Sequence, residues 1–167
     1  MDLNQQAKEI LKIKEKSMSK HTERLELIAI DKLIPYANNA RTHSDDQIKK
    51  IQASLREFGF VNPVLIDKDC GIIAGHGRVE AAKREGMTEV PCVWVEHLTE
   101  AQKKAYILAD NRLAELASWD MDIVNSELAD LETIDFDISL TGFEAIDVDL
   151  SIFEEDDADT DNSNQKS

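Results

Sequence analysis

The stretch Gly71-Ile72-Ile73-Ala74-Gly75-His76-Gly77-Arg78-Val79-Glu80-Ala81-Ala82-Lys83-Arg84-Glu85-Gly86 decides the fold that this sequence predicts. Its short apolar run, residues 72–74, is typical of a buried strand. Residues 79–84 are typical of a helix, and a glycine such as Gly86 often ends one. We therefore expect a strand, a glycine turn and a helix N-terminus in immediate succession.

A turn of this kind can bind an anion. Unpaired N–H groups and the positive end of the helix dipole point out of it. Gly75 and Gly77 let the backbone approach a ligand closely, and Arg78 adds a guanidinium suited to bidentate phosphate contact. The residues predict a nucleotide phosphate site. The alternative is a tight turn with a surface arginine, since the stretch lacks the third glycine of a G-x-G-x-x-G motif.

Composition predicts one domain with tails. The chain has 167 residues, 42% of them hydrophobic, which suffices for a core. No apolar run approaches the roughly 20 residues of a membrane helix, and the N-terminus shows no signal-peptide core. The two cysteines, Cys70 and Cys92, form no disulfide framework, so we expect a cytoplasmic location. No histidine or cysteine spacing indicates zinc.

The net charge of −15 is unevenly distributed. Residues 144–167 hold nine acidic residues against Lys166 alone, whereas residues 41–112 balance eleven basic with eleven acidic residues. Broad nonspecific binding of duplex DNA requires a basic face, which this composition does not offer. Any contact with nucleic acid must come from a local patch or a partner.

Shifts in composition along the chain predict four regions: a flexible polar arm or frayed helix (1–24), a mixed core of strands and helices (25–98), a helical extension (99–143) and an acidic, mostly disordered tail (144–167). The expected strands are 25–30, 64–66, 72–74 and 92–95. The expected helices are 45–58, 79–84, 99–117, 121–131 and a short one within 144–153. Ile48, Ile51, Leu55 and Phe58 should form one buried face of the helix over 45–58.

Two further segments carry candidate site residues. Asp110, Asn111 and Arg112 are consecutive polar residues within an apolar helix, which is costly if they are buried without partners. They indicate either a site, where Asp110 and Asn111 offer oxygen ligands for Mg²⁺, or a structural hydrogen-bond cluster. Arg41, in the long loop after the first strand, is either a second anion ligand or an exposed loop residue.

These pieces together resemble the ParB/sulfiredoxin superfamily, and specifically its ParB-like N-terminal domain, over about residues 25–143. The resemblance is carried, in order, by Leu33-Ile34-Pro35 with Asn39-Ala40-Arg41, by Asn62-Pro63-Val64, by Ile73-Ala74-Gly75-His76-Gly77-Arg78-Val79-Glu80-Ala81, by Gly86 with Val90-Pro91, and by Ala109-Asp110-Asn111-Arg112. It implies an α+β fold, with a small mixed sheet, flanking helices and a C-terminal helical extension.

The resemblance also implies a ligand. Partition-type ParB proteins bind CTP with Mg²⁺. Carried over, Gly75, Gly77 and Arg78 would hold phosphate with His76 and Arg41 nearby, and Asp110 and Asn111 would hold or approach the metal. The sequence departs from the family pattern at His76, Gly77 and Glu80, which replace a glutamate and two arginines, and this puts CTP preference and hydrolysis in doubt. The glycine turn has no cysteine, so sulfiredoxin chemistry is not expected.

Three functional hypotheses follow. The first is a nucleotide-binding domain (CTP or ATP, with Mg²⁺) in phage or mobile-element DNA metabolism, with slow hydrolysis at most. The second is a Mg²⁺-dependent DNA nuclease. The third is a non-enzymatic adaptor whose acidic tail docks a basic partner such as a DNA methyltransferase. Oligomers are compatible with each. The acidic residues after Arg112 offer no basic recognition helix, so we do not expect a complete partition factor.

Overall fold

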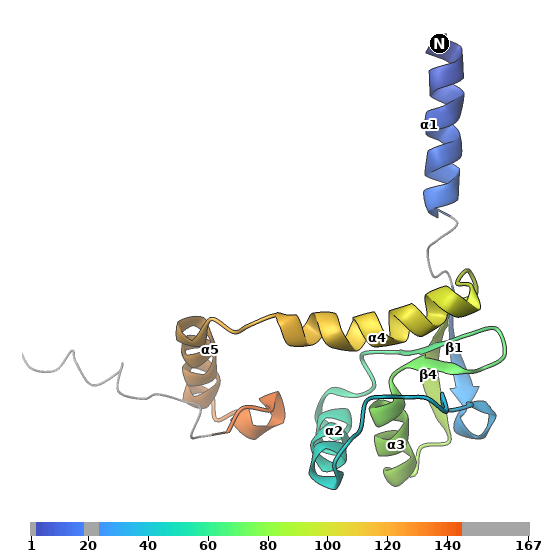
Figure 1. Cartoon of the computed structure of the whole chain (residues 1–167). Helices are drawn as coiled ribbons and strands as arrows, with labels where there is room; N and C mark the ends of the chain where they lie inside the picture. The colour runs from blue at the N-terminus through green and yellow to red at the C-terminus, as the bar shows by residue number, and fades with distance from the viewer. Residues whose placement is uncertain (1–2, 19–23, 145–167) are drawn as a thin grey trace, which may run out of the picture. The chain divides into compact units, whose positions relative to one another are not determined.

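The computed structural model describes residues 3–18 and 24–144. The chain divides into two compact units, Met1–Ala117 and Ser118–Ser167. Figure 1 shows the elements of both units. Among the described residues, no helix is long and apolar enough to cross a membrane. The expected helix within 144–153 and the acidic tail lie, apart from Glu144, outside the described residues.

A mixed four-stranded sheet forms the centre of the first unit. Its strands are β1 (Leu25–Ala29), β2 (Val64–Ile66), β3 (Ile72–Ala74) and β4 (Glu89–Trp94), in the order β1-β4-β2-β3. β4 pairs antiparallel with β1 and parallel with β2, and β2 pairs antiparallel with β3. β4 starts three residues earlier than predicted, and its Pro91 lies opposite Leu27 of β1, before pairing with β2 begins at Cys92. The α+β fold with a small mixed sheet is confirmed.

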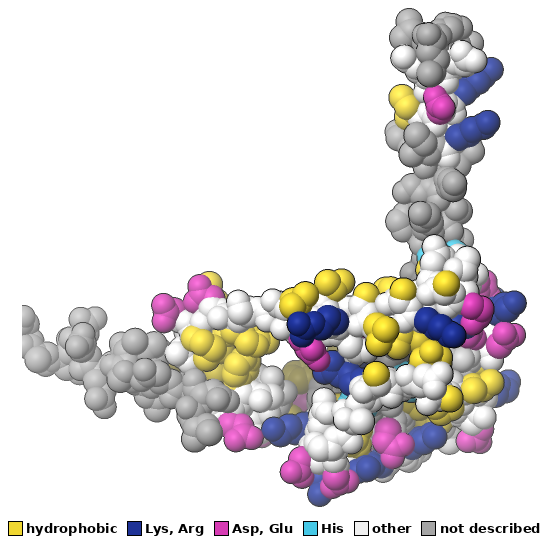
Figure 2. Space-filling view, viewed as in Figure 1, with side chains coloured by type: hydrophobic (Ala, Val, Ile, Leu, Met, Phe, Trp, Pro, Cys, Tyr) yellow, Lys and Arg dark blue, Asp and Glu magenta, His cyan; other side chains and the backbone are white. Residues whose placement is uncertain are grey.

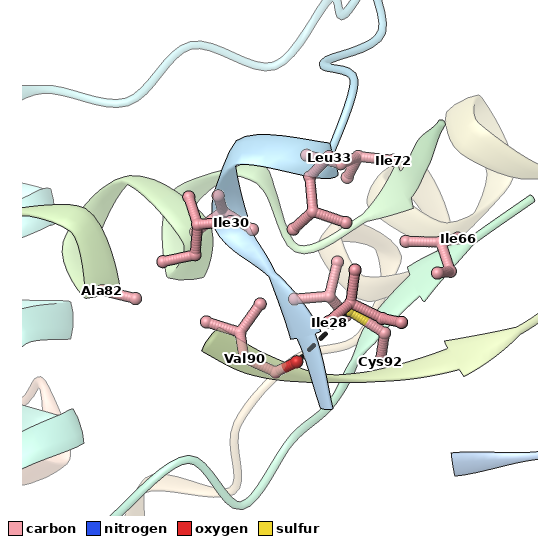
Figure 3. Close-up of a cluster of buried hydrophobic side chains, with 10 residues drawn as sticks. Ile28, Ile30, Leu33, Ile66, Ile72, Ala82, Val90 and Cys92 are labelled. Atoms are coloured by element: carbon pink, nitrogen blue, oxygen red, sulfur yellow. Dashed lines mark hydrogen bonds between the residues drawn. The ribbon is translucent and has the colours of Figure 1, made fainter. Parts of the chain in front are cut away.

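Alternation along the short strands buries both faces of the sheet. One face forms the main core, which receives Val64 and Ile66 of β2, Ile72 of β3, and side chains of α3 (His76–Arg84). Figure 3 shows this cluster, in which the Cys92 thiol lies 3.5 Å from the Val90 carbonyl oxygen. The other face packs Ile73 against Ile107 of α4 (Glu100–Leu116). Helices therefore cover both faces.

Local capping signals fix where several helices begin. The Ser44 hydroxyl accepts a hydrogen bond from the Gln47 N–H at the start of α2 (Asp45–Phe58). The Gln47 side chain contacts His43, so it does not return to the Ser44 N–H to form a capping box. Thr99 and Gln102 form a complete capping box before α4. These starts agree with the sequence-based prediction.

One prediction of burial is wrong. Phe58, expected on the buried face of α2, is 47% exposed because the helix ends there, at Gly59, while Ile48 is buried. The helix around Asp110 is also exposed over much of its surface. Of its apolar side chains only Ile107 is buried, and Leu108 and Leu113 are at least 60% exposed. Only one stripe of α4 meets the sheet, so its polar residues are not forced into the core.

The ends of the described chain are helical. α1 (Leu3–Met18) forms a helix within the predicted polar arm. The second unit contains α5 (Met121–Thr133), capped by the Asp120 carboxylate, and a 3-10 turn, η2 (Ile138–Thr141). The Trp119 and Phe143 rings meet edge to face with centroids 5.3 Å apart. This edge-to-face contact closes the second unit around α5.

Candidate functional site

A cavity of about 520 Å³ opens in the first unit where the β3–α3 turn meets α2, α4 and the loop before α2. Its volume lies within the usual range for small-molecule sites. All seven residues predicted for the site line it, brought together from three separate segments of the sequence: Arg41, Gly75, His76, Gly77, Arg78, Asp110 and Asn111. The structure gives the positions of these residues; their roles stay predictions.

The glycine turn leaves the start of α3 uncapped. Gly75 occupies the N-cap position with φ +106° and ψ +20°, a left-handed conformation, and offers no side chain to the helix. The first N–H that reaches a helical carbonyl is that of Val79, which bonds to Gly75. The N–H groups of His76, Gly77 and Arg78 therefore have no helical acceptor and stand at the positive end of the helix dipole.

Close packing requires both glycines. A Cβ on Gly75 would lie 2.9 Å from Nη2 of Arg78, and one on Gly77 would lie 2.9 Å from Cε1 of His43. Any larger residue would displace one of these two side chains. The turn is thus shaped around the arginine on one side and a histidine on the other.

Arg78 is a half-buried cation with an unsatisfied donor. Its Nη2 donates to the Pro63 carbonyl at 3.0 Å, but its Nε is buried without a hydrogen-bond partner. Burial lowers the pKa of Arg78, and the charge of Asp110 opposes this effect. Within the described part of the chain, Arg78 makes no ion pair. An anion in the cavity would supply the missing charge and acceptor.

Two histidines form another part of the wall. His76 Nε2 accepts a hydrogen bond from the Tyr36 N–H at 3.1 Å, so this nitrogen carries no proton. Burial lowers the pKa of His76, and the proximity of His43 lowers it further. His43 Nδ1 lies 3.2 Å from Oε1 of Gln47, which can only accept, so His43 donates there. The His76 side chain thus anchors the loop that carries Tyr36.

α4 contributes the opposite wall of the cavity. The Tyr106 hydroxyl donates to Asp110 at 3.4 Å, and burial followed by the Asp110 charge raises the pKa of Tyr106. Both polar atoms of the Asn111 side chain already make hydrogen bonds. Its oxygen accepts from Arg41 at 3.2 Å, and its nitrogen donates to the Ile107 carbonyl at 2.8 Å. Asp110 is exposed and is the better placed of the two predicted metal ligands.

A partly buried ion pair holds α4 in this position. Lys103 Nζ lies 2.7 Å from Oδ2 of Asp67, and both side chains are only 16% exposed. Burial acts to raise the pKa of Asp67, but hydrogen bonds from Lys103 and from the N–H groups of Gly71 and Asp69 outweigh it and lower the pKa. The β2–β3 turn is therefore tied to the first turns of α4, which sets the helix over the cavity.

Sequence reasoning missed several lining residues: Asn39, His43, Gln47, Asn62 and Tyr106. Asn39 and Asn62 belong to segments that carry the family resemblance, but they were not assigned to the site, and no chemical motif marks the other three residues. Cys70 is a turn residue with φ +64°, and burial raises the pKa of Cys92 to about 11. Among the described residues, no group of three His, Cys, Asp or Glu side chains could hold a metal ion alone.

Comparison with known families and proteins gives a consistent result. The model of the ParB N-terminal domain matches residues 14–112. The ParB-like nuclease domain-containing protein YnaK of Escherichia coli (strain K12) is 46% identical over 85 residues, covering 50% of this chain and 98% of YnaK. The probable chromosome-partitioning protein ParB of Rickettsia bellii (strain RML369-C) is 31% identical over 90 residues, covering 53% of this chain and 31% of that protein.

Among solved structures, the C-terminally truncated chromosome-partitioning protein ParB from Caulobacter crescentus, complexed with CTP-gamma-S, superposes with a TM-score of 0.59. It is 21% identical, and the alignment covers 72% of this chain and 69% of that one. This likeness shows a shared fold. The chain spans nearly the whole of YnaK but about a third of the Rickettsia partitioning protein.

Proposed function

The chain belongs to the ParB N-terminal domain family, and from this premise we propose that its cavity binds a nucleoside triphosphate, CTP or ATP, together with Mg²⁺. The phosphates would lie against the turn of Gly75, His76, Gly77 and Arg78, with Arg41 nearby. The Caulobacter ParB structure that shares the fold was determined with CTP-gamma-S, which supports a nucleotide as the ligand class.

The observation that carries this proposal is the state of Arg78. A half-buried guanidinium with an unpaired Nε and no ion pair within the described residues lines the cavity beside the uncapped start of α3. Charge-assisted hydrogen bonds to phosphate oxygens would satisfy the guanidinium and the free N–H groups together. A side chain at Gly75 or Gly77 would collide with its neighbours, so only glycine fits at these two positions.

The residues present also fit a hydrated magnesium ion brought by the phosphates. Mg²⁺ commonly binds through one or two carboxylates, substrate phosphates and water. Asp110 would supply the carboxylate, and Tyr106 would orient it through the hydrogen bond observed. Because Asp110 is the one carboxylate among the described residues that line the cavity, we expect any hydrolysis to be slow.

We place this binding in DNA metabolism of a phage or mobile element. The names of the relatives, which include chromosome-partitioning proteins, support a DNA-related role. The resemblance of Gly75–Arg78 and Ala109–Arg112 to domains of phages and mobile elements supports the narrower setting, where DNA or a methyltransferase would be the partner. The nuclease alternative draws on the name of YnaK, but the described residues that line the cavity include no cluster of carboxylates of the kind that a metal-dependent nuclease uses.

Isothermal titration with CTP, ATP and GTP in the presence of Mg²⁺ tests the proposal. We expect saturable binding of CTP or ATP, and a loss of affinity of about 10- to 100-fold in Arg78→Gln, the usual effect of removing a hydrogen bond to a charged group. Arg84→Gln is the matched control, since Arg84 lies on the same helix but pairs with Asp45 and Glu80 outside the cavity.

Two outcomes would contradict the assignment. Wild-type protein that binds none of the three nucleotides removes the proposed ligand, and Arg78→Gln that binds as tightly as wild type removes the proposed site. Plasmid nicking that requires Mg²⁺ and disappears in Asp110→Asn would favour the nuclease instead.

A further inference from the structure

The second unit carries an apolar groove that the nucleotide proposal does not use. It has a volume of about 300 Å³ between α5 and the segment that ends in Phe143. Its floor includes Leu128, which is 3% exposed, whereas Trp119 and Ile123 on its rim are 71% and 62% exposed. Figure 2 shows the hydrophobic side chains gathered at α5. An exposed apolar surface of this kind commonly marks a site of protein–protein contact.

All the charged residues in the segment that forms the groove are acidic. Residues 118–144 contain eight acidic residues and no Lys, Arg or His. Asp120 and Glu127 lie at the groove itself. In the part of the chain that the structure describes, no acidic side chain of residues 118–143 takes part in an ion pair. The groove therefore fits an amphipathic helix with apolar side chains flanked by lysines or arginines.

The chain itself contains a helix with these properties. α1 carries Lys8, Lys12, Lys14 and Lys16 against Glu9 and Glu15. Ile10 and Leu11 of this helix are 55% and 57% exposed, so these two apolar side chains are uncovered. An isolated 16-residue helix of this composition is marginally stable in water, and burial of its apolar side chains would stabilise it.

We infer that the α5 groove receives α1 of a second copy of this chain. Each copy has one groove and one such helix, so two copies can exchange both contacts in a closed, two-fold symmetric dimer. The apolar side chains of residues 145–153 are a poorer occupant, because Asp147 and Asp149 among them share the charge sign of the groove. Opposite charges near an exposed groove also predict association that weakens as the salt concentration rises.

Sedimentation of the full-length chain tests this inference. We expect wild type to form dimers with rising concentration at low salt, and both Ile10→Asp and Ile123→Asp to stay monomeric. Ile134→Asp is the matched control: Ile134 is 71% exposed just after α5 but does not line the groove, so this variant should dimerise like wild type. All three substitutions are at exposed positions, which limits their effect on folding.

Mixing the two disrupted variants provides the decisive measurement. The Ile10→Asp chain keeps an intact groove and the Ile123→Asp chain keeps an intact α1, so an equimolar mixture should regain association through one contact. A mixture that stays monomeric overturns the inference, as does a wild-type chain that remains monomeric up to several hundred micromolar. Dimerisation that survives both single substitutions also overturns it, since the interface would then lie elsewhere. None of these outcomes depends on nucleotide binding.

Discussion

The two units of this chain differ in how they use charge. Residues 1–117 contain eighteen basic and eighteen acidic residues, whereas residues 118–167 contain one basic and sixteen acidic residues and so account for the whole net charge of −15. In the first unit the charges meet one another, as in the pairs Lys103–Asp67 and Arg84–Asp45. In the second, Asp120 and Asp137 accept hydrogen bonds from backbone N–H groups instead.

This difference in charge goes with a difference in how each unit is stabilised. The first unit has a two-sided core and internal charge pairs, so its stability comes from within. Among its described residues, the second has one deeply buried aliphatic side chain, Leu128, which lies under an open apolar groove, and the unit carries an unbalanced negative charge. Each unit has its own tryptophan, Trp94 or Trp119, so Trp119→Phe and Trp94→Phe backgrounds report on the two units separately.

The largest expected effect compares the two cores. Ile66→Ala should destabilise the first unit by about 2–5 kcal/mol, because Ile66 is fully buried and truncation leaves a closed cavity. Leu128→Ala should cost less, since the space it leaves joins the open groove. Urea unfolding of the single-tryptophan backgrounds measures both changes. Equal losses of unfolding free energy in the two units would show that the side chain of Leu128 is packed as tightly as that of Ile66, which would contradict an open groove.

Removing the buried charge partner of Asp67 should give the next largest effect. Lys103→Met leaves a largely buried carboxylate without its cation, and we expect a loss of about 2–4 kcal/mol at neutral pH. Asp120→Ala in the second unit removes only a helix cap and should cost about 1 kcal/mol. Urea midpoints of each variant against its background measure the difference.

The pH dependence of this pair has a definite sign. The pKa of Asp67 is lowered in the folded state, so the pair contributes stability above the unfolded value near 3.8, which disappears as the pH falls through the folded value. Lys103→Met should therefore lose less stability than wild type on acidification. If the loss of stability at low pH were the same in Lys103→Met as in wild type, Lys103 would contribute through its alkyl chain alone.

Replacing a glycine of positive φ by alanine should have different effects in the two units. Gly75→Ala combines a strained backbone with a Cβ 2.9 Å from Nη2 of Arg78, so we expect a loss of about 1–3 kcal/mol and weaker nucleotide binding. Gly142→Ala has φ +85° but open space around its Cβ, so it should cost about 1–2 kcal/mol and leave binding unchanged. Urea unfolding and nucleotide titration of both variants separate strain from displacement of Arg78.

The smallest expected effect is a loss of stability as the pH falls below about 6.5, and it is confined to the first unit. The folded pKa of His76 lies below the unfolded value of 6.5, so its contribution is present above that value and is lost as the pH falls through the folded value. His76→Gln should reduce this dependence of stability on pH, measured by urea unfolding followed through Trp94 fluorescence. Residues 118–167 contain no histidine, so the Trp119 signal should not change with this substitution.

Much of the fold could be predicted because its signals are local. Apolar alternation indicated the strands. Helices were expected to start near residues 45, 99 and 121, and in the structure Ser44, Thr99 and Asp120 cap these three helices through contacts within three residues. The family resemblance, carried by short motifs in a fixed order, was sufficient to group the candidate site residues. The burial of Phe58 was predicted wrongly, because periodicity shows that a helix has an apolar face but not how far a neighbour covers it.

By itself, the sequence determined the strand, glycine turn and helix around Gly75, the caps and the unequal distribution of charge, since each depends on neighbouring residues or on composition. Only the tertiary structure decided which groups surround the turn. The Tyr36 N–H reaches His76 across 40 residues and Arg41 reaches Asn111 across 70, while His43 packs on Gly77. Burial and hydrogen bonding between distant segments depend on how the sheet and helices pack, and this packing leaves Arg78 with an unpaired Nε in the cavity wall.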